Sequence, residues 1–236
     1  MTEQWHNLSP DETLRGLNSR RSGLTGHETE KRLLLCGANE LKGKQKTPPM
    51  LVFLRQFLNP LIYILIIAAV ISIIVEHHID AWVILGVLLL NAIIGFTQEI
   101  RAEKAIESLI QMAAPKARVR RDGHIQLLPA REIVSGDILL LETGDRVAAD
   151  ARLIEGSNLK MNEAPLTGES MPVDKHTGAL SETAVSVAER KNLIYMGTTV
   201  TYGRATAVVT KTGMSTEIGK ITTAIQEVNP EKTPLQ

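Results

Sequence analysis

Two long runs of apolar residues dominate the first half of the chain. No side chain is charged from residue 57 to residue 75, and a second charge-free run extends from residue 81 to residue 98. A bilayer core of about 30 Å is crossed by roughly 17–25 helical residues, so each run is long enough to span it. Two soluble core helices joined only by residues 76–80 would leave apolar surface that nothing covers. The pattern therefore predicts a transmembrane hairpin.

Basic residues lie on one side of this predicted hairpin. They are Lys42, Lys44, Lys46 and Arg55 before the first run, and Arg101 and Lys104 after the second. The short connection carries Glu76 and Asp80 but neither Lys nor Arg. By the positive-inside rule, both ends of the hairpin, and so both termini, are expected in the cytoplasm. Helical composition continues past residue 98, which predicts a stalk that ends near Pro115.

The N-terminal part of the chain carries helix start signals. Ser9 is followed three residues later by Glu12, and Thr25 is followed in the same way by Glu28. Both pairs have the composition of a capping box, in which each side chain bonds the backbone of the other residue. Gly37 supplies a stop for the second helix. Two short helices are therefore expected ahead of the hairpin.

From residue 116 onward the pattern changes to the alternation that is typical of strands. Residues 117–121 and 125–128 flank Asp122-Gly123, which is a strong signal for a two-residue hairpin turn. Further strands are expected at 138–141, 151–154, 198–201 and 205–210, with turns at Gly136-Asp137, Gly144-Asp145 and Tyr202-Gly203-Arg204. Many short strands without intervening helices predict an antiparallel sandwich or distorted jelly roll. Residues 216–221 begin a terminal helix.

Composition excludes several classes of protein. Lys and Arg together number 26, as do Asp and Glu, so the net charge is zero and no nucleic-acid partner is expected. Cys36 is the only cysteine, which excludes an intrachain disulfide and a cysteine-cluster metal site. We expect Cys36 to be a buried helix residue. The six histidines show no zinc spacing, so no metal site is predicted.

The candidate chemistry lies in the four residues Thr167, Gly168, Glu169 and Ser170. One interpretation is a plain turn, in which glycine permits a tight backbone and the hydroxyls cap neighbouring groups. In the other interpretation, Gly168 lets a phosphate approach closely and the hydroxyls of Thr167 and Ser170 bond its oxygens. Glu169 would then deprotonate a water for attack on an aspartyl-phosphate. The loop alone does not decide between these interpretations.

The motifs around the loop do favour one of them, because their order resembles the actuator domain of P-type ATPases. These motifs are residues 134–138, 142–150, 166–173 and 213–221, and residues 57–61 and 91–99 resemble the first two spans of type II pumps, especially calcium pumps. The resemblance implies that Glu169 is the water-activating carboxylate. It also implies that Thr167, Gly168 and Ser170 form the docking loop.

The chain departs from the family pattern in places. The family usually has proline at the positions of Thr143 and Ala148, and Asp-Glu-Ser where this chain has Asn162-Glu163-Ala164. These departures bear on the subtype more than on the family. Residues 174–178, Asp-Lys-His-Thr-Gly, are faintly similar to the family's phosphorylation motif Asp-Lys-Thr-Gly-Thr, but the inserted His176 spoils the spacing. We interpret this segment as a surface loop.

We therefore expect an α+β membrane protein that forms the N-terminal portion of a type II P-type cation pump. Its parts are cytoplasmic N-terminal helices (1–46), a transmembrane hairpin with a stalk (47–115), a β-rich actuator domain (116–214), and a terminal helix leading toward a third span (215–236). The expected partners are the lipid bilayer and the phosphorylation domain and later spans of a complete pump. ATP and Mg²⁺ are implied for that pump, whereas no cofactor is expected in this chain, which alone should be inactive.

The transported ion stays open. Resemblance favours calcium, while sodium/potassium, proton and manganese are alternatives. Neither apolar run contains a mid-membrane Asp, Glu, Lys or Arg, so the hairpin holds no strong cation site. A rival of a different class is a membrane-anchored, non-catalytic binding or regulatory module. A heavy-metal pump is disfavoured because no Cys-x-x-Cys segment precedes the first run.

Overall fold

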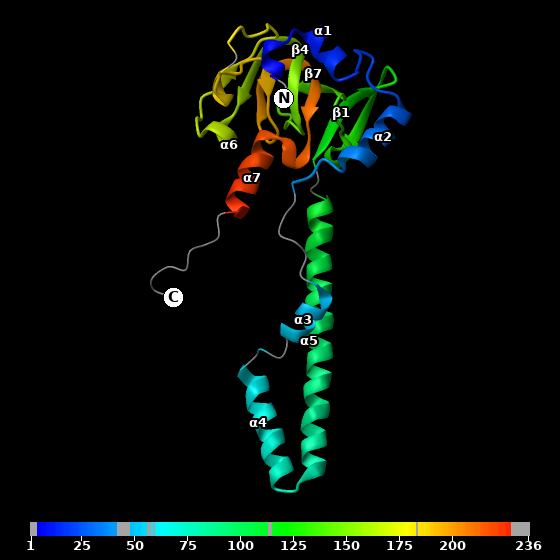
Figure 1. Cartoon of the computed structure of the whole chain (residues 1–236), viewed down its shortest axis with the longest axis vertical. Coiled ribbons are helices and arrows are strands. Elements are labelled where there is room, and N and C mark those ends of the chain that lie inside the picture. The colour runs from blue at the N-terminus through cyan, green and yellow to red at the C-terminus, as the bar shows by residue number, and fades with distance from the viewer. Residues whose placement is uncertain are drawn as a thin grey trace. The chain divides into compact units, whose positions relative to one another are not determined.

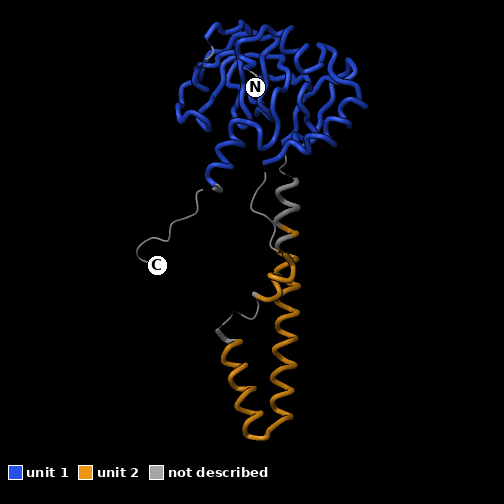
Figure 2. The backbone as a smooth tube through the Cα atoms, viewed as in Figure 1, with its two compact units in different colours: residues 1–42, 114–236 blue, residues 43–113 orange. Residues whose placement is uncertain are grey.

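The chain divides into two units, which Figure 2 shows in different colours: residues 1–42 with 114–236, and residues 43–113. The computed structural model describes residues 4–41, 48–55, 58, 60–112, 115–182 and 184–227. Several features predicted from the sequence lie outside these residues: the basic residues Lys42, Lys44 and Lys46, the start of the first apolar run and the C-terminal tail beyond residue 227.

The unit of residues 43–113 is helical. It contains α3 (Pro49–Arg55), α4 (Pro60–Ile74) and α5 (His78–Met112), and α4 and α5 lie side by side (Figure 1). Phe53 of α3 meets Phe96 of α5 edge to face, with ring centroids 5.9 Å apart. Among the described residues, one segment, His78–Ala102, is a helix long and apolar enough to cross a membrane, and Ile62–Ile74 is a shorter apolar helix. The two-span hairpin therefore stays a prediction.

The connection between α4 and α5 is shorter than predicted. We expected residues 76–80 to form it, but α5 already begins at His78. Asp80 lies in the first turn of α5, where a carboxylate is favourable to the helix dipole, and it contacts the ring of His77 at 3.1 Å. The helix then continues to Met112, as expected for a stalk that ends near Pro115.

The other unit is built on a seven-stranded sheet in which every pairing is antiparallel. Its strands are β1 (Lys116–Arg121), β2 (His124–Pro129), β3 (Ile138–Glu142), β4 (Asp150–Asn162), β5 (Val173–Asp174), β6 (Leu193–Ile194) and β7 (Thr199–Lys211). The order is β2-β1-β3-β7-β4-β5, and β6 pairs with β4. The predicted hairpin at Asp122-Gly123 is confirmed, and both residues have positive φ, as a tight two-residue turn requires.

The predicted turn at Tyr202-Gly203-Arg204 is wrong, because β7 runs straight through it. Gly203 has a φ of 86°, and a Cβ atom there would lie 2.4 Å from the carbonyl oxygens of Ser157 and Asn158. The register between β4 and β7 shifts at this place. The glycine therefore serves a bulge and a close backbone approach rather than a chain reversal. Consequently β7 is one long strand where two short strands, 198–201 and 205–210, were expected, and β4 extends well beyond the expected strand at 151–154.

Helices and short 3₁₀ turns complete this unit. They are a 3₁₀ turn at Trp5–Asn7, α1 (Pro10–Gly16), α2 (Gly26–Cys36), 3₁₀ turns at Ala130–Glu132, Val187–Glu189 and Gly213–Ser215, α6 (Ala164–Thr167) and α7 (Glu217–Glu227). Both predicted capping boxes are formed: the N–H of Glu12 donates to Ser9, and that of Glu28 to Thr25. The expectation that Cys36 is buried is wrong: Cys36 is the last residue of α2, and its side chain is exposed.

The core of this unit lies on both faces of the sheet. Leu139 and Ala207 belong to the main cluster of buried side chains, whereas Ile138 and Val208 face the opposite side. Leu14 of α1 packs against that second side, so α1 covers part of this face of the sheet. Figure 1 shows α1 lying beside β4.

Candidate functional site

The predicted loop begins with the single helical turn α6. Asn162 ends β4, and its Oδ1 accepts a hydrogen bond from the N–H of Ala164 at 3.0 Å. The carbonyl of Glu163 accepts bonds from the N–H groups of Leu166 at 2.9 Å and Thr167 at 3.0 Å. Asn162 therefore forms an Asx turn that leads directly into α6. Short polar side chains favour such turns, because they can bond the backbone two residues further on.

Gly168 ends this turn. It has φ 78° and ψ −5°, the left-handed conformation that favours glycine, and its N–H donates to the carbonyl of Ala164 at 2.9 Å. The hydroxyl of Thr167 donates to the carbonyl of Glu163 at 3.2 Å and accepts from the N–H of Glu169 at 3.3 Å. The Thr167 hydroxyl therefore serves the backbone of the loop itself, as the plain-turn interpretation expected.

Beyond Gly168 the side chains point away from the fold. Glu169 and Ser170 are exposed, and Met171 is 78% exposed. Among the described residues, the carboxylate of Glu169 has no hydrogen-bond or ion-pair partner. The structure thus brings the four predicted residues together in one tight loop, and it leaves a free carboxylate at the tip. Such a carboxylate can take a proton from a water that is held against another group.

A buried ion pair joins Glu163, which precedes the loop, to Lys175, which follows it, and no pattern in the sequence predicted this pair. The Nζ of Lys175 is 2.6 Å from Oε1 of Glu163, and both side chains are fully buried. Our interpretation of residues 174–178 as a surface loop is therefore wrong for Lys175. The cause is the short strand β5, which pairs with β4 and places the next residue inside the domain. Burial raises the pKa of Glu163 and lowers that of Lys175, while each partner opposes the shift in the other.

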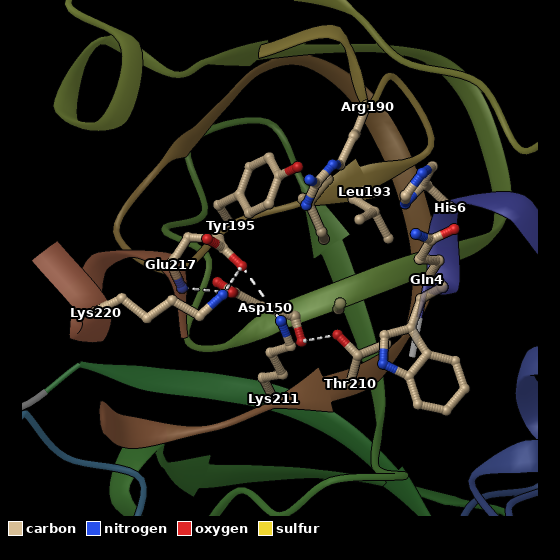
Figure 3. A pocket seen from close by; sticks show the side chains of 13 residues that line it. Gln4, His6, Asp150, Arg190, Leu193, Tyr195, Thr210, Lys211, Glu217 and Lys220 are labelled. Atoms are coloured by element: carbon tan, nitrogen blue, oxygen red, sulfur yellow. Dashed lines mark hydrogen bonds and ion pairs between the residues drawn. The ribbon is translucent and has the colours of Figure 1, made fainter. Parts of the chain in front are cut away.

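The family-like segments 142–150 and 213–221 meet at Asp150. Its carboxylate accepts hydrogen bonds from the N–H of Met196 and from that of Glu217, the first residue of α7, both at 2.8 Å. Burial raises the pKa of Asp150 to about 6. Asp150 lines a cavity of about 250 Å³, in which Glu217 contacts Lys211 at 3.2 Å and Lys220 at 2.7 Å (Figure 3). The charged groups here hold the start of α7.

The two predicted Gly-Asp turns have a structural role as well. Asp137 pairs with Arg121 through two bonds, of 2.9 and 2.6 Å, and it also accepts the N–H of Val134 at 2.9 Å. Asp145 pairs with Arg118 at 2.7 Å. These carboxylates fix turns between strands. Only the Thr167–Ser170 loop therefore offers an exposed carboxylate without partners among the family-like motifs described.

Comparison with known proteins agrees with this arrangement. Residues 111–226 match the P-type ATPase actuator domain, and residues 5–72 match the N-terminus of cation transporters and ATPases. "Calcium-transporting ATPase 1" of Bacillus cereus is 44% identical over 98% of this chain and 27% of its own length. "Calcium-transporting ATPase" of Bacillus subtilis is 38% identical over 99% and 26%, and "Cation-transporting ATPase pma1" of Synechocystis is 44% identical over 90% and 23%.

The chain belongs to the P-type ATPase family. Within that family it corresponds to the N-terminal part, and its sheet unit is the actuator domain of the kind found in calcium-transporting members. The chain spans about a quarter of the length of the curated relatives it matches. These matches do not favour the alternative of a non-catalytic anchored module.

Proposed function

We propose that this chain supplies the actuator part of an ATP-driven cation pump, in which Glu169 activates the water that hydrolyses an aspartyl-phosphate. The observation that carries the proposal is the position of Glu169. Its carboxylate is exposed and has no polar partner among the described residues, while the backbone before it is fixed by the carbonyls of Glu163 and Ala164. A general base must be held in place yet be free to accept a proton.

The proposed step needs only water and the phosphorylated domain of the pump. Glu169 takes a proton from the water while the oxygen of that water bonds to phosphorus. The bond between phosphorus and the aspartyl oxygen then breaks, which releases the aspartate carboxylate and inorganic phosphate. Thr167, Gly168 and Ser170 dock the loop against that domain. ATP and Mg²⁺ are needed by the complete pump for phosphorylation, and we assign no residue of this chain to either.

The ion and the membrane arrangement belong to the same proposal. Relatives named as calcium-transporting ATPases make calcium the first candidate. We propose that both apolar segments cross the lipid bilayer, that both termini are cytoplasmic, and that the later spans of the pump pack with them. In this arrangement the sheet unit is the distorted jelly roll expected from its strands, and α5 leaves the membrane as a stalk.

The substitution Glu169→Gln in the complete pump tests the catalytic role. It keeps the size of the side chain but removes the base, so phosphoenzyme should still form from ATP and then decay about 10²–10⁴-fold more slowly. The decay is followed with labelled ATP after an acid quench. Glu182→Gln, which changes another exposed carboxylate of the same domain, is the matched control and should decay normally. Normal decay in Glu169→Gln would reject the proposal.

Cysteine labelling tests the membrane arrangement. Because Cys36 is exposed, it must first be replaced by serine. In that background, a cysteine at Ile79, which is 80% exposed at the start of α5, should react with an impermeant reagent added outside the cell. A cysteine at Ile125, 60% exposed on β2, should react only after the membrane is opened. The opposite pattern would reverse the proposed topology.

A further inference from the structure

A buried ion pair brackets the Thr167–Ser170 loop. Glu163 stands directly before α6, and Lys175 stands directly after β5, so the pair joins the two ends of the loop. The nitrogen and oxygen are 2.6 Å apart, and neither side chain is exposed. A second pair, between Lys160 of β4 and Asp174 of β5 at 3.1 Å, lies close by in the sequence but is exposed to solvent.

The backbone of Glu163 supports the loop directly. Its carbonyl accepts hydrogen bonds from the N–H groups of Leu166 and Thr167 and from the Thr167 hydroxyl. The Thr167 hydroxyl in turn accepts the N–H of Glu169. A change in the orientation of the Glu163 carbonyl therefore shifts the backbone of Glu169, because the Thr167 hydroxyl is bonded to both residues.

Lys175 is the contact that fixes the side chain of Glu163. Among the described residues, neither oxygen of the Glu163 carboxylate has a hydrogen-bond partner, so the buried carboxylate depends on the ion pair between its Oε1 and the Nζ of Lys175. Lys175 has weaker contacts of its own: its Nζ lies 3.4 Å from the carbonyl of Arg190 and 5.6 Å from the ring centre of Tyr195. The ion pair thus connects the start of the loop to the part of the domain that carries these two residues.

We propose that Glu163 and Lys175 are positioning residues, whose ion pair holds the loop so that Glu169 points toward the phosphorylated group. This inference rests on the proposed function of Glu169. Stability alone is a poor explanation for the pair, because replacing a buried ion pair by apolar groups of similar volume is often neutral or stabilising. The exposed pair Lys160–Asp174 links β4 and β5 without removing either charge from water, so it carries no desolvation penalty of this kind.

Three variants of the complete pump separate positioning from stability. Glu163→Gln and Lys175→Met each leave one buried charge without its partner, so both should also lower stability. The double variant Glu163→Gln/Lys175→Met leaves no buried charge at these two positions and should recover much of that stability. Asp174→Asn, which breaks only the exposed pair, is the matched control.

The readout is the first-order decay of phosphoenzyme, which follows only molecules that are folded and phosphorylated. Misplacement of a catalytic group by 1 Å can cost about 100-fold, so we expect decay about 10- to 100-fold slower in the double variant, with Asp174→Asn unchanged. Should the single variants fail to fold, the double variant still gives the answer. Normal decay in a folded double variant, together with slow decay in Glu169→Gln, would overturn the positioning role and leave the proposed function standing. Normal decay in Glu169→Gln would instead reject the proposed function.

Amide hydrogen exchange on the present chain tests the positioning role without any catalysis. The N–H groups of Leu166, Thr167 and Gly168 are bonded to the carbonyls of Glu163 and Ala164. If the ion pair holds this turn, these amides should exchange at least about tenfold faster in the double variant, while the amides of β1 and β2 keep their rates. Unchanged exchange in the turn would overturn the inference whatever the outcome for Glu169.

Discussion

The Thr167–Ser170 loop and the surroundings of Arg152 hold charged side chains in opposite ways, although both lie in the sheet unit. Glu169 is exposed, and its carboxylate has no polar partner among the described residues. Arg152 is fully buried and donates only to backbone carbonyls. The first arrangement leaves a charge available to a group outside the domain. The second uses a charge to join distant parts of the chain, so the two should respond very differently to substitution.

The carbonyls around Arg152 come from segments far apart in the sequence. They belong to Trp5, Leu8, Leu153, Thr177 and Asn192, at distances of 2.7 to 3.3 Å. The planar guanidinium carries five N–H donors in a fixed fork, which suits it to such a set of acceptors. Burial lowers the pKa of Arg152 to about 10, so the side chain remains charged at neutral pH.

Tryptophan fluorescence offers a way to measure these differences. The chain has two tryptophans. Trp5 is buried against Leu193 and Tyr195 in the sheet unit, whereas Trp82 is 74% exposed on α5. In a Trp82→Phe background, Trp5 alone reports the unfolding of the sheet unit in urea, with the helical unit kept in detergent.

The largest loss of stability is expected for Arg152→Met. The carbonyls of Trp5 and Asn192 also accept backbone N–H groups, so at most three of the five acceptors lose their donor. Each buried carbonyl left without a donor costs about 1–3 kcal/mol, so the free energy of unfolding should fall by about 3 kcal/mol or more. Arg204→Met is the control, because Arg204 is exposed on β7 and its replacement should stay within about 0.5 kcal/mol of wild type. A loss below about 1 kcal/mol for Arg152→Met would mean that water replaces the guanidinium.

A smaller loss is expected for Asn39→Ala. The Asn39 side chain donates to the carbonyls of Ala130 and Ala148, both at 2.9 Å, and accepts the N–H of Gly213 at 2.8 Å. Its removal should cost about 2–3 kcal/mol, since it leaves buried backbone groups without partners. Gln126→Ala, on the exposed part of β2, should have little effect in the same urea titration. Equal effects of the two substitutions would contradict the structural role of Asn39.

The effect of Asp150 should depend on pH. Because its pKa is raised from 3.8 to about 6 by burial, the folded state binds a proton more readily than the unfolded state. The stability from that proton is present below pH 4 and is lost as the pH rises through 6, by on the order of 2 kcal/mol. Urea unfolding from pH 4 to pH 7 should show this fall in wild type and a flatter profile in Asp150→Asn. Parallel profiles would assign the titration to another group.

Local signals in the sequence were sufficient for the features that depend on neighbouring residues. The capping boxes and the Asp122-Gly123 hairpin were predicted correctly, and the four loop residues are contiguous. The errors concern contacts made across the fold. Gly203 has positive φ because β4 passes close to it, and Lys175 is buried because β5 turns it toward Glu163. Cys36 is exposed because α2 buries other positions. The spacing of neighbouring residues cannot predict such contacts, because the residues concerned are brought together only by the fold.

The smallest change in stability is expected for Glu169→Gln, the same substitution that should have the largest effect on hydrolysis. Its side chain is exposed and supports no core, so the free energy of unfolding should change by less than about 0.5 kcal/mol. Gly168→Ala is the control in the same loop. At a φ of 78° an alanine is strained, and a loss of about 1 kcal/mol should be seen, which proves that the measurement detects changes there. A loss above about 1.5 kcal/mol for Glu169→Gln would exceed what an exposed surface residue contributes. The plain-turn interpretation of the loop would then be the better one, because Glu169 would be a part of the fold and not a carboxylate kept free for water.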